Sequence, residues 1–229
     1  MTAPRAITLD LDDTLWPIAP VIARAEQALH RWLLDHAPEV AHRFDVEAMR
    51  QLRDEVAGQR PDWAHDFTRI RHHSISLALQ QCGHDPALAD AAFQAFYAAR
   101  NELELFPGVE QALQRLAERF PLLALTNGNA DLSRLPIGRL FVGTVSAREF
   151  GVGKPDARIF HAACARLGCA PPEVLHVGDD WALDVLGARA AGMQVAWLRH
   201  AEAPAPVAGT DGVWVIDHLQ QLVQVLITD

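Results

Sequence analysis

Short apolar runs alternate with stretches of helical periodicity over much of the chain. A first run covers residues 6–11, and later ones cover residues 122–125, 142–145, 174–177, 195–198 and 213–216. Helical segments separate most of these runs, at residues 110–119, 157–167 and 182–191. Continuous apolar runs of this length are typical of buried parallel strands, and their alternation with helices is typical of a parallel sheet. The pattern predicts an α/β fold with a Rossmann-like parallel sheet core.

One long segment departs from this alternation. From residue 17 to about residue 105, apolar positions recur at intervals of three and four, as at Val21, Ala25 and Leu29, and no convincing strand interrupts them. We therefore expect two parts: a core made of residues 1–15 and 108–229, and a helical insertion at residues 16–107.

Composition and charge narrow the classes of partner. The 229 residues carry 20 Lys and Arg against 29 Asp and Glu, a formal charge of -9, which argues against nucleic acid as the main partner. No window approaches the run of roughly 18 apolar residues that a membrane-spanning helix needs, so we expect no membrane insertion. Acidic residues interrupt the first apolar run, which excludes a signal peptide, and three cysteines without metal-site spacing fit a reducing compartment. A cytoplasmic location is expected.

Polar residues gather at four points, at or just beyond the predicted carboxyl ends of strands. These are residues 10–14, 126–128, 154–155 and 178–184. In open α/β sheets, ligands bind at this edge. Three of the acids, Asp10, Asp12 and Asp179, would repel one another there and raise each other's pKa, which indicates a divalent cation. Oxygen ligands alone favour Mg²⁺.

Taken together and in this order, the four motifs resemble those of the haloacid dehalogenase superfamily, most of whose members are phosphohydrolases. The helical insertion lies where that superfamily has an α-helical cap. The resemblance implies that Asp10 is a metal ligand and also the nucleophile that takes up the phosphoryl group as an aspartyl-phosphate. It implies that Asp12 protonates the leaving oxygen and then activates water, while its backbone carbonyl binds the metal. Asp179 would complete the metal's protein ligands.

The resemblance also implies roles for the other motif residues. The Thr126 hydroxyl and the Asn127 backbone N–H would hydrogen-bond the phosphoryl oxygens, and Lys154 would stabilise the transition state by its charge. Asp180 and Asp184 would act through waters or by orienting Lys154.

Two reactions of the superfamily compete at such a site. Halide leaves without protonation and needs no metal, so a 2-haloacid dehalogenase has no use for an acid at Asp12 or a ligand at Asp179. The presence of both favours a phosphatase. A cap that closes over the cleft implies a small-molecule phosphate ester as the substrate. Phosphoryl transfer to a sugar, as in a phosphomutase, and a binding module without turnover remain as alternatives.

A narrower resemblance is carried by residues 9–17, 125–130 and 176–180. These look like the bacterial branch that dephosphorylates 5-amino-6-(5-phospho-D-ribitylamino)uracil, an intermediate of riboflavin synthesis, and also accepts flavin mononucleotide (FMN). Sugar phosphates and phosphoglycolate are the alternative substrates, because specificity lies mostly in the cap, where no diagnostic motif is found.

Two tryptophans and two hinges complete the expectations for the cap. Trp16 and Trp63 are candidates for stacking on a flat ring such as a flavin or pyrimidine, with core packing as the competing role for Trp63. The cap is expected to be mobile, with hinges at Pro17 and at Pro107-Gly108.

Overall fold

The computed structural model describes residues 3–200 and 211–227 and divides the chain into two compact units. One unit comprises Met1–Pro17 and Glu104–Asp229, and the other comprises Ile18–Leu103. In sequence, the second unit is inserted between the two segments of the first, as a helical insertion after the first strand would be. The second boundary falls before Glu104, a little earlier in the chain than Pro107-Gly108.

The core unit is built on a six-stranded sheet in which every neighbouring pair is parallel. Its strands are β1 (Ala6–Leu9), β2 (Leu122–Thr126), β3 (Phe141–Ser146), β4 (Val174–Gly178), β5 (Gln194–Leu198) and β6 (Val213–Ile216). They lie in the order β3-β2-β1-β4-β5-β6. The predicted α/β fold with a Rossmann-like sheet is confirmed, and each predicted strand is present.

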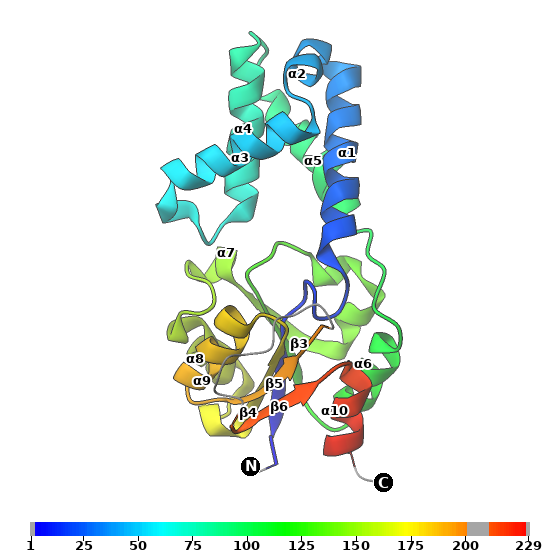
Figure 1. The fold of residues 1–229 in the computed structure, drawn as a ribbon, viewed down its shortest axis with the longest axis vertical. Helices are drawn as coiled ribbons and strands as arrows, with labels where there is room; N and C mark the ends of the chain where they lie inside the picture. The colour runs from blue at the N-terminus through cyan, green and yellow to red at the C-terminus, as the bar shows by residue number, and fades with distance from the viewer. Residues whose placement is uncertain (1–2, 201–210, 228–229) are drawn as a thin grey trace. The chain divides into compact units, whose positions relative to one another are not determined.

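Helices cover both faces of this sheet (Figure 1). The α-helices of the unit are α6 (Val109–Ala117), α7 (Ala147–Phe150), α8 (Ala157–Leu167), α9 (Gly187–Ala190) and α10 (Leu219–Leu226). Short 3₁₀ segments are η2 (Leu132–Arg134), η3 (Pro136–Leu140) and η4 (Pro171–Glu173), and η5 (Trp181–Leu186) is a π-helix leading into α9. Helices α8 and α9 lie on one side of the sheet, and α6 and α10 lie on the other.

The strands are apolar because both of their faces are covered. All four residues of β1 and all five of β2 and β4 are buried. Alternate side chains such as Leu123, Val174 and Val195 join the buried residues of α8 and α9 in one cluster. The central pair β1 and β4 marks the point where the strand order reverses, since β2 lies on the other side of β1. A crevice for ligands is expected outside the carboxyl ends of strands at such a point.

The second unit is entirely helical among its described residues. Its elements are α1 (Ile18–His36), α2 (Pro38–Arg43), α3 (Val46–Gln59), η1 (Pro61–Trp63), α4 (Phe67–Gln81) and α5 (Leu88–Arg100). Apolar side chains of α1, α4 and α5 form its main core, including Leu29, Ile75 and Phe96. In the described part of the chain, no helix combines the length and apolar character needed to cross a bilayer.

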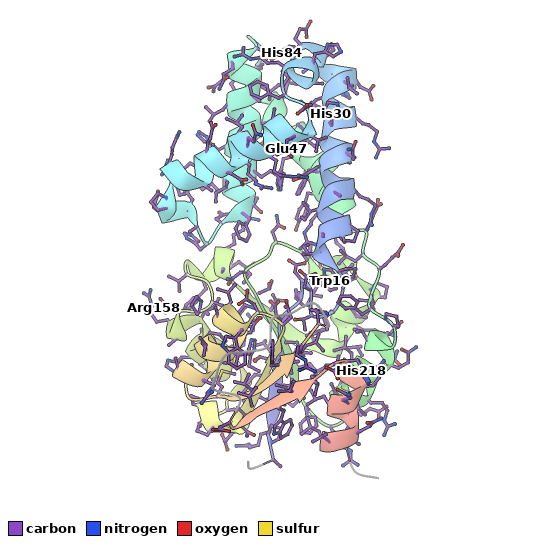
Figure 2. All side chains as sticks on the ribbon, viewed as in Figure 1. Trp16, His30, Glu47, His84, Arg158 and His218 are labelled. Carbon is purple, nitrogen blue, oxygen red and sulfur yellow. The ribbon has the colours of Figure 1, made fainter. Side chains whose placement is uncertain are left out.

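A buried carboxylate joins three helices of this unit. Glu26 of α1, with 4% of its side chain exposed, pairs with Arg50 at 2.5 Å, Arg53 at 3.3 Å and Arg71 at 3.6 Å. Burial lowers the pKa of Arg71 to about 10, and Arg53 adds to that effect, while Glu26 opposes it. Glu47, which Figure 2 shows on α3, pairs with Arg50 at 3.0 Å but is 62% exposed. Glu26 therefore supplies the buried negative charge that lets α1, α3 and α4 pack together.

Replacing Glu26 by Gln should destabilise the helical unit by about 3 kcal/mol, because the guanidinium of Arg71 would then be buried without its counter-charge. Urea unfolding followed by circular dichroism measures this. Glu47→Gln is the matched control, since it removes an exposed partner of the same Arg50 and should cost at most about 0.5 kcal/mol. Equal losses for the two variants would contradict the assignment.

Candidate active site

The sequence motifs converge at the carboxyl edge of the sheet. Asp10 follows β1, where its backbone N–H donates to the carbonyl of Val177 at 2.9 Å and so continues the ladder with β4. Thr126 ends β2, and Asp179 follows β4 directly. Carboxylate oxygens of Asp10, Asp179 and Asp184 lie within 4.8 Å of one another. Residues separated by up to 174 positions thus form one acidic group.

A buried ammonium lies within this acidic group. The Lys154 Nζ donates to Asp10 Oδ1 at 2.5 Å and to Asp184 Oδ1 at 2.6 Å. Only 2% of the Lys154 side chain is exposed. Burial by itself would lower the pKa of Lys154, but the charges and hydrogen bonds of Asp10 and Asp184 outweigh it and raise that pKa. The lysine is therefore held fully charged.

A chain of hydrogen bonds holds Asp184 from behind. His176 Nε2 lies 2.9 Å from Asp184 Oδ1, and His176 Nδ1 lies 2.8 Å from Thr8 Oγ1. Burial lowers the pKa of His176, so the ring is neutral. Since an ionised carboxylate only accepts, Nε2 carries the proton and donates to Asp184, while Nδ1 accepts from the Thr8 hydroxyl. Thr8 and His176 face each other across the β1–β4 pair.

These contacts keep Asp184 ionised despite complete burial. Burial opposes its ionisation most strongly, but Lys154 and His176 together lower the pKa of Asp184 to about 2. Its second oxygen accepts from the backbone N–H of Asp180 at 3.1 Å. A side chain on Gly178 would place its Cβ only 2.3 Å from the Asp184 Cγ, so the carboxylate requires glycine at the end of β4.

The other two carboxylates lack comparable compensation. Burial raises the pKa of Asp10 well above its usual range, and the negative charge of Asp184 adds to the effect, while Lys154 opposes it. Burial and Asp184 also raise the pKa of Asp179 to about 6, against a hydrogen bond from Thr14 Oγ1 at 3.1 Å. A group with three acids and one lysine is short of positive charge. This donor set fits a small divalent cation bound by oxygen ligands.

Asp184 is less suited than Asp10 and Asp179 to bind such an ion directly. Its oxygens already accept from Lys154, His176 and the Asp180 backbone. Within the described residues, Asp10 Oδ1 accepts a hydrogen bond from Lys154, and Asp179 Oδ1 accepts one from Thr14. The side chain of Asp12 is not part of the acidic group. The expected contribution of Asp12 to metal binding would therefore come from its backbone carbonyl alone.

Two further loops shape the edge of the sheet. The Asn127 side chain donates to the Lys154 carbonyl at 2.9 Å and accepts from the Lys154 backbone N–H at 2.7 Å. The Thr126 hydroxyl accepts from the Gly128 N–H at 2.9 Å. The paired bonds of Asn127 thus attach the loop after β2 to the backbone of Lys154.

Asp180 has a local structural contact. Its Oδ1 accepts from the backbone N–H groups of Ala182 and Leu183, both at 2.8 Å, and so caps the helical segment that follows. Lys154 is contacted directly by Asp184. Asp180 and Asp184, for which the resemblance implied the same role, therefore have different surroundings.

The expectation that Trp16 and Trp63 stack on a substrate ring needs correction. Trp16 is completely buried, and its indole N–H donates to Asp12 Oδ1 at 2.8 Å. Trp63 is 6% exposed, with the guanidinium of Arg60 at 3.6 Å and that of Arg69 at 4.1 Å from its ring centre. Buried rings already covered by neighbouring groups present no open face for a ligand.

Three side chains were not singled out from the sequence as parts of the site. His176 supports Asp184, Thr14 donates to the Asp179 carboxylate, and the Trp197 indole donates to the Asp179 carbonyl at 2.8 Å. Thr14 stands within the first motif, and His176 directly precedes the last one, so position gave a weak signal for both. Trp197 lies 18 residues from Asp179 in sequence and has no such signal.

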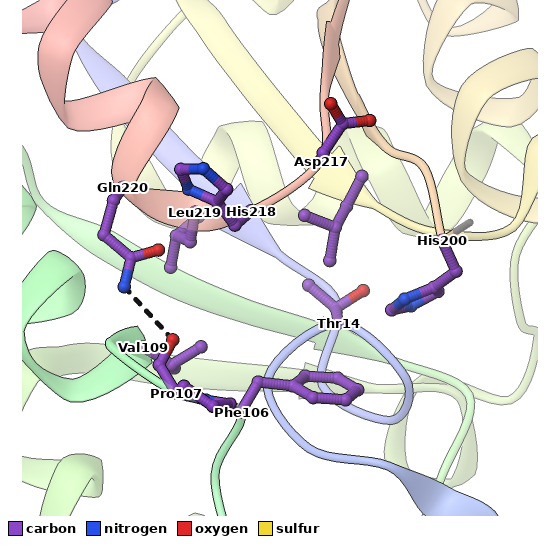
Figure 3. A pocket seen from close by; sticks show the side chains of 10 residues that line it. Thr14, Phe106, Pro107, Val109, His200, Asp217, His218, Leu219 and Gln220 are labelled. Carbon is purple, nitrogen blue, oxygen red and sulfur yellow. Dashed lines mark hydrogen bonds between the residues drawn. The ribbon is translucent and has the colours of Figure 1, made fainter.

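A separate pocket of about 430 Å³ lies on the core unit, beside the loop that contains Thr14 (Figure 3). Thr14, Phe106, His200 and His218 are among its lining residues. His200 Nε2 contacts the Asp13 carbonyl at 2.5 Å, and its ring lies 5.4 Å from that of Phe106. Its lining residues include Asp217 but neither Lys154 nor any of Asp10, Asp179 and Asp184, so the pocket is distinct from the acidic group.

Comparisons with known proteins agree with this geometry. Residues 4–192 match the family model described as haloacid dehalogenase-like hydrolase. A 5-amino-6-(5-phospho-D-ribitylamino)uracil phosphatase of Escherichia coli (strain K12) is 35% identical over 198 residues, covering 85% of this chain and 83% of that protein. A glyceraldehyde 3-phosphate phosphatase of Methanopyrus kandleri is 31% identical, covering 86% and 85% respectively.

A solved structure is similar over nearly the whole chain. A protein named 2-haloacid dehalogenase, from Pseudomonas syringae pv. tomato DC3000, has a TM-score of 0.89 and 35% identity, with 97% of this chain and 98% of that chain covered. The family model spans the first strand, the helical unit and the motifs after β2 and β4. With its parallel sheet, its helical insertion after β1 and its acidic group, the chain belongs to the haloacid dehalogenase-like hydrolases.

Proposed function

We propose that this hydrolase is a Mg²⁺-dependent phosphatase that cleaves small phosphate monoesters through an aspartyl-phosphate on Asp10. The observation that carries the proposal is the pairing of the buried Asp10 carboxylate with the Lys154 ammonium, beside the carboxylate of Asp179. A nucleophile, a fixed positive charge and a metal-ligand set at one edge of the sheet are what attack on a phosphoryl group requires.

The first half of the reaction transfers the phosphoryl group to the protein. A carboxylate oxygen of Asp10 attacks phosphorus while the bond to the ester oxygen breaks, and Asp12 gives its proton to the departing alkoxide. The Thr126 hydroxyl and the Asn127 backbone N–H bind the phosphoryl oxygens. Lys154 stabilises the negative charge of the transition state from its position between Asp10 and Asp184.

The second half regenerates the protein. Asp12, now ionised, takes a proton from a water that attacks phosphorus, the acyl-phosphate bond breaks, and inorganic phosphate leaves with Asp10 restored. Asp10, Asp179 and the backbone carbonyl of Asp12 would hold Mg²⁺, which supplies charge neutralisation for the phosphate and the acids. Asp184 keeps Lys154 in place throughout.

Dehalogenation is the second candidate, because one similar solved structure bears that name. Displacement of halide by Asp10 would need neither a proton donor nor a metal. Asp12 and Asp179 would then only add negative charge close to the attacking carboxylate. Since the acidic group is already short of positive charge, phosphoryl transfer accounts for more of its residues.

For the substrate we propose a riboflavin-pathway intermediate of the ribitylaminopyrimidine type, or FMN. The support is the resemblance of residues 9–17, 125–130 and 176–180 to the bacterial branch that acts on this intermediate, together with the similarity to the E. coli phosphatase. The buried Trp16 and Trp63 give no added support for a flat ring. A sugar phosphate or phosphoglycolate is therefore the alternative, and the similarity to a glyceraldehyde 3-phosphate phosphatase favours it.

Asp10→Asn should lower kcat at least about 1,000-fold by removing the nucleophile, and Asp12→Asn should lower it about 100- to 10,000-fold by removing the proton relay. Phosphate release under saturating substrate measures both. Asp13→Asn is the control: it makes the same charge change in the same loop, and Asn tolerates the positive φ of 56° at that position. It should stay within about tenfold of the wild type. Folded Asp10→Asn protein with near wild-type turnover would contradict covalent catalysis.

Removal of Mg²⁺ with EDTA should abolish turnover, and adding excess Mg²⁺ should restore it, because the carboxylates otherwise meet a phosphate without compensating charge. Ca²⁺ should inhibit, since its larger radius and looser coordination disturb in-line attack. Steady-state phosphate release with each ion tests this. Unchanged activity after exhaustive chelation would exclude the metal-dependent mechanism.

A release screen with Mg²⁺ should give the highest kcat/KM for the ribitylaminopyrimidine phosphate or FMN, above glyceraldehyde 3-phosphate, phosphoglycolate and other sugar phosphates. Halide release from a 2-haloacid is measured alongside and should be absent. Preference for a ring-less ester would move the substrate assignment to the sugar-phosphate alternative. An isomerised sugar phosphate in place of free phosphate would identify a mutase instead.

A further inference from the structure

The Asp12 carboxylate has a close neighbour at each of its two oxygens. Oδ1 accepts from the Trp16 indole N–H at 2.8 Å. Oδ2 lies against the backbone of Gly128, where any Cβ would come within 2.3 Å of it. The carboxylate is therefore enclosed between the indole edge and the loop after β2.

Trp16 itself has a fixed position. Its side chain is completely buried, and its backbone carbonyl accepts from the N–H of Asp13 at 2.8 Å. The tight loop that results has Asp13 in the left-handed region at φ 56°. An indole locked at both backbone and ring presents its N–H to Asp12 in a single orientation.

We propose that Trp16 is a positioning residue that fixes the orientation of the Asp12 carboxylate for proton transfer to the leaving oxygen. The inference rests on the proposed phosphatase function, in which Asp12 acts as acid and base. The buried indole N–H that binds Oδ1 at 2.8 Å holds the carboxylate in one orientation, and proton transfer requires a donor held in the correct geometry. Trp16 thereby aims the acid at the leaving oxygen, and its effect on turnover passes through Asp12.

A positioning role for Trp16 affects the relative rates of different esters, which a role in packing alone does not. Loss of a correctly aimed acid slows esters whose alcohol must be protonated as it leaves. It matters little for 4-nitrophenyl phosphate, whose phenolate leaves without a proton. The ratio of kcat/KM for an alkyl phosphate to kcat/KM for 4-nitrophenyl phosphate isolates this step, because kcat/KM reports the reaction only as far as phosphorylation of Asp10.

The test is Trp16→Phe, which keeps an aromatic ring and removes the N–H. The alkyl-to-aryl ratio should fall about 10- to 100-fold, with the aryl value changed less than about threefold. Trp214→Phe, a tryptophan of β6 outside the proposed machinery, should leave both values unchanged. In an Asp12→Asn background, Trp16→Phe should have no further effect, because the residue through which it acts is gone.

A second variant approaches Asp12 from its other side. Gly128→Ala places a methyl group against Oδ2 and should lower the same ratio, so it tests the proposal if Trp16→Phe does not fold. An unchanged ratio in the folded variants, or equal losses for both esters, would overturn the role of Trp16 while leaving the phosphatase assignment intact. Wild-type protein that releases no phosphate from either ester would overturn both.

Discussion

The buried ion group of Lys154 with Asp10 and Asp184 is the interaction on which the rest of the site depends. An ammonium with 2% exposure is tolerated only with close counter-charges, and here two carboxylates bind it at 2.5 and 2.6 Å. Removing either acid would leave buried charge uncompensated. This requirement extends inward through His176 to Thr8, so the interior of the sheet supports the candidate site at its edge.

The strand order makes this group possible. Adjacent β1 and β4 bring Asp10 and Asp179 to the same edge, and β4 also carries His176 in register with Thr8. Because both faces of the sheet are covered, the polar chain from Thr8 to Lys154 lies in a region of low dielectric, where each hydrogen bond is strengthened and each unpaired charge is costly. The helical unit shows the reverse arrangement, in which one buried carboxylate, Glu26, is shared by three arginines.

Charge balance also bears on the choice between the two candidate reactions, phosphoryl transfer and dehalogenation. Lys154 is committed to Asp10 and Asp184, so Asp179 has no lysine of its own, and its pKa rises to about 6. The ionised form of such a carboxylate is unfavourable unless a cation binds beside it. A cation bound there would also neutralise negative charge on a phosphate substrate. Asp12 lies apart from this acidic group, bound by the Trp16 indole. In the proposed mechanism, the acid that transfers protons, Asp12, is thus separate from the acids that would bind the cation.

The class of fold and the expected position of the candidate site both follow from the amino-acid sequence. Apolar runs are a direct consequence of strands buried on both faces, and motifs at strand ends must meet at one edge of a parallel sheet. The same kind of reasoning separates the core from the helical insertion. A recurrence of apolar residues every three or four positions can be recognised in the sequence without knowing which residues pack against one another. Asp10, Thr126, Lys154 and Asp179 were predicted in this way as candidate site residues.

Which side chains contact one another is visible only in the folded structure. Periodicity shows which face a residue occupies but not what packs against it, and contacts such as Thr8 with His176 or Thr14 with Asp179 span more than 160 residues. Trp16 and Trp63 illustrate the limit, because the sequence does not show whether a tryptophan ring is open to a ligand or covered by neighbouring groups. The Trp63 ring is covered by two guanidinium groups. Strand register and the packing of neighbouring elements fix these contacts, because they set the distance and direction on which each hydrogen bond depends.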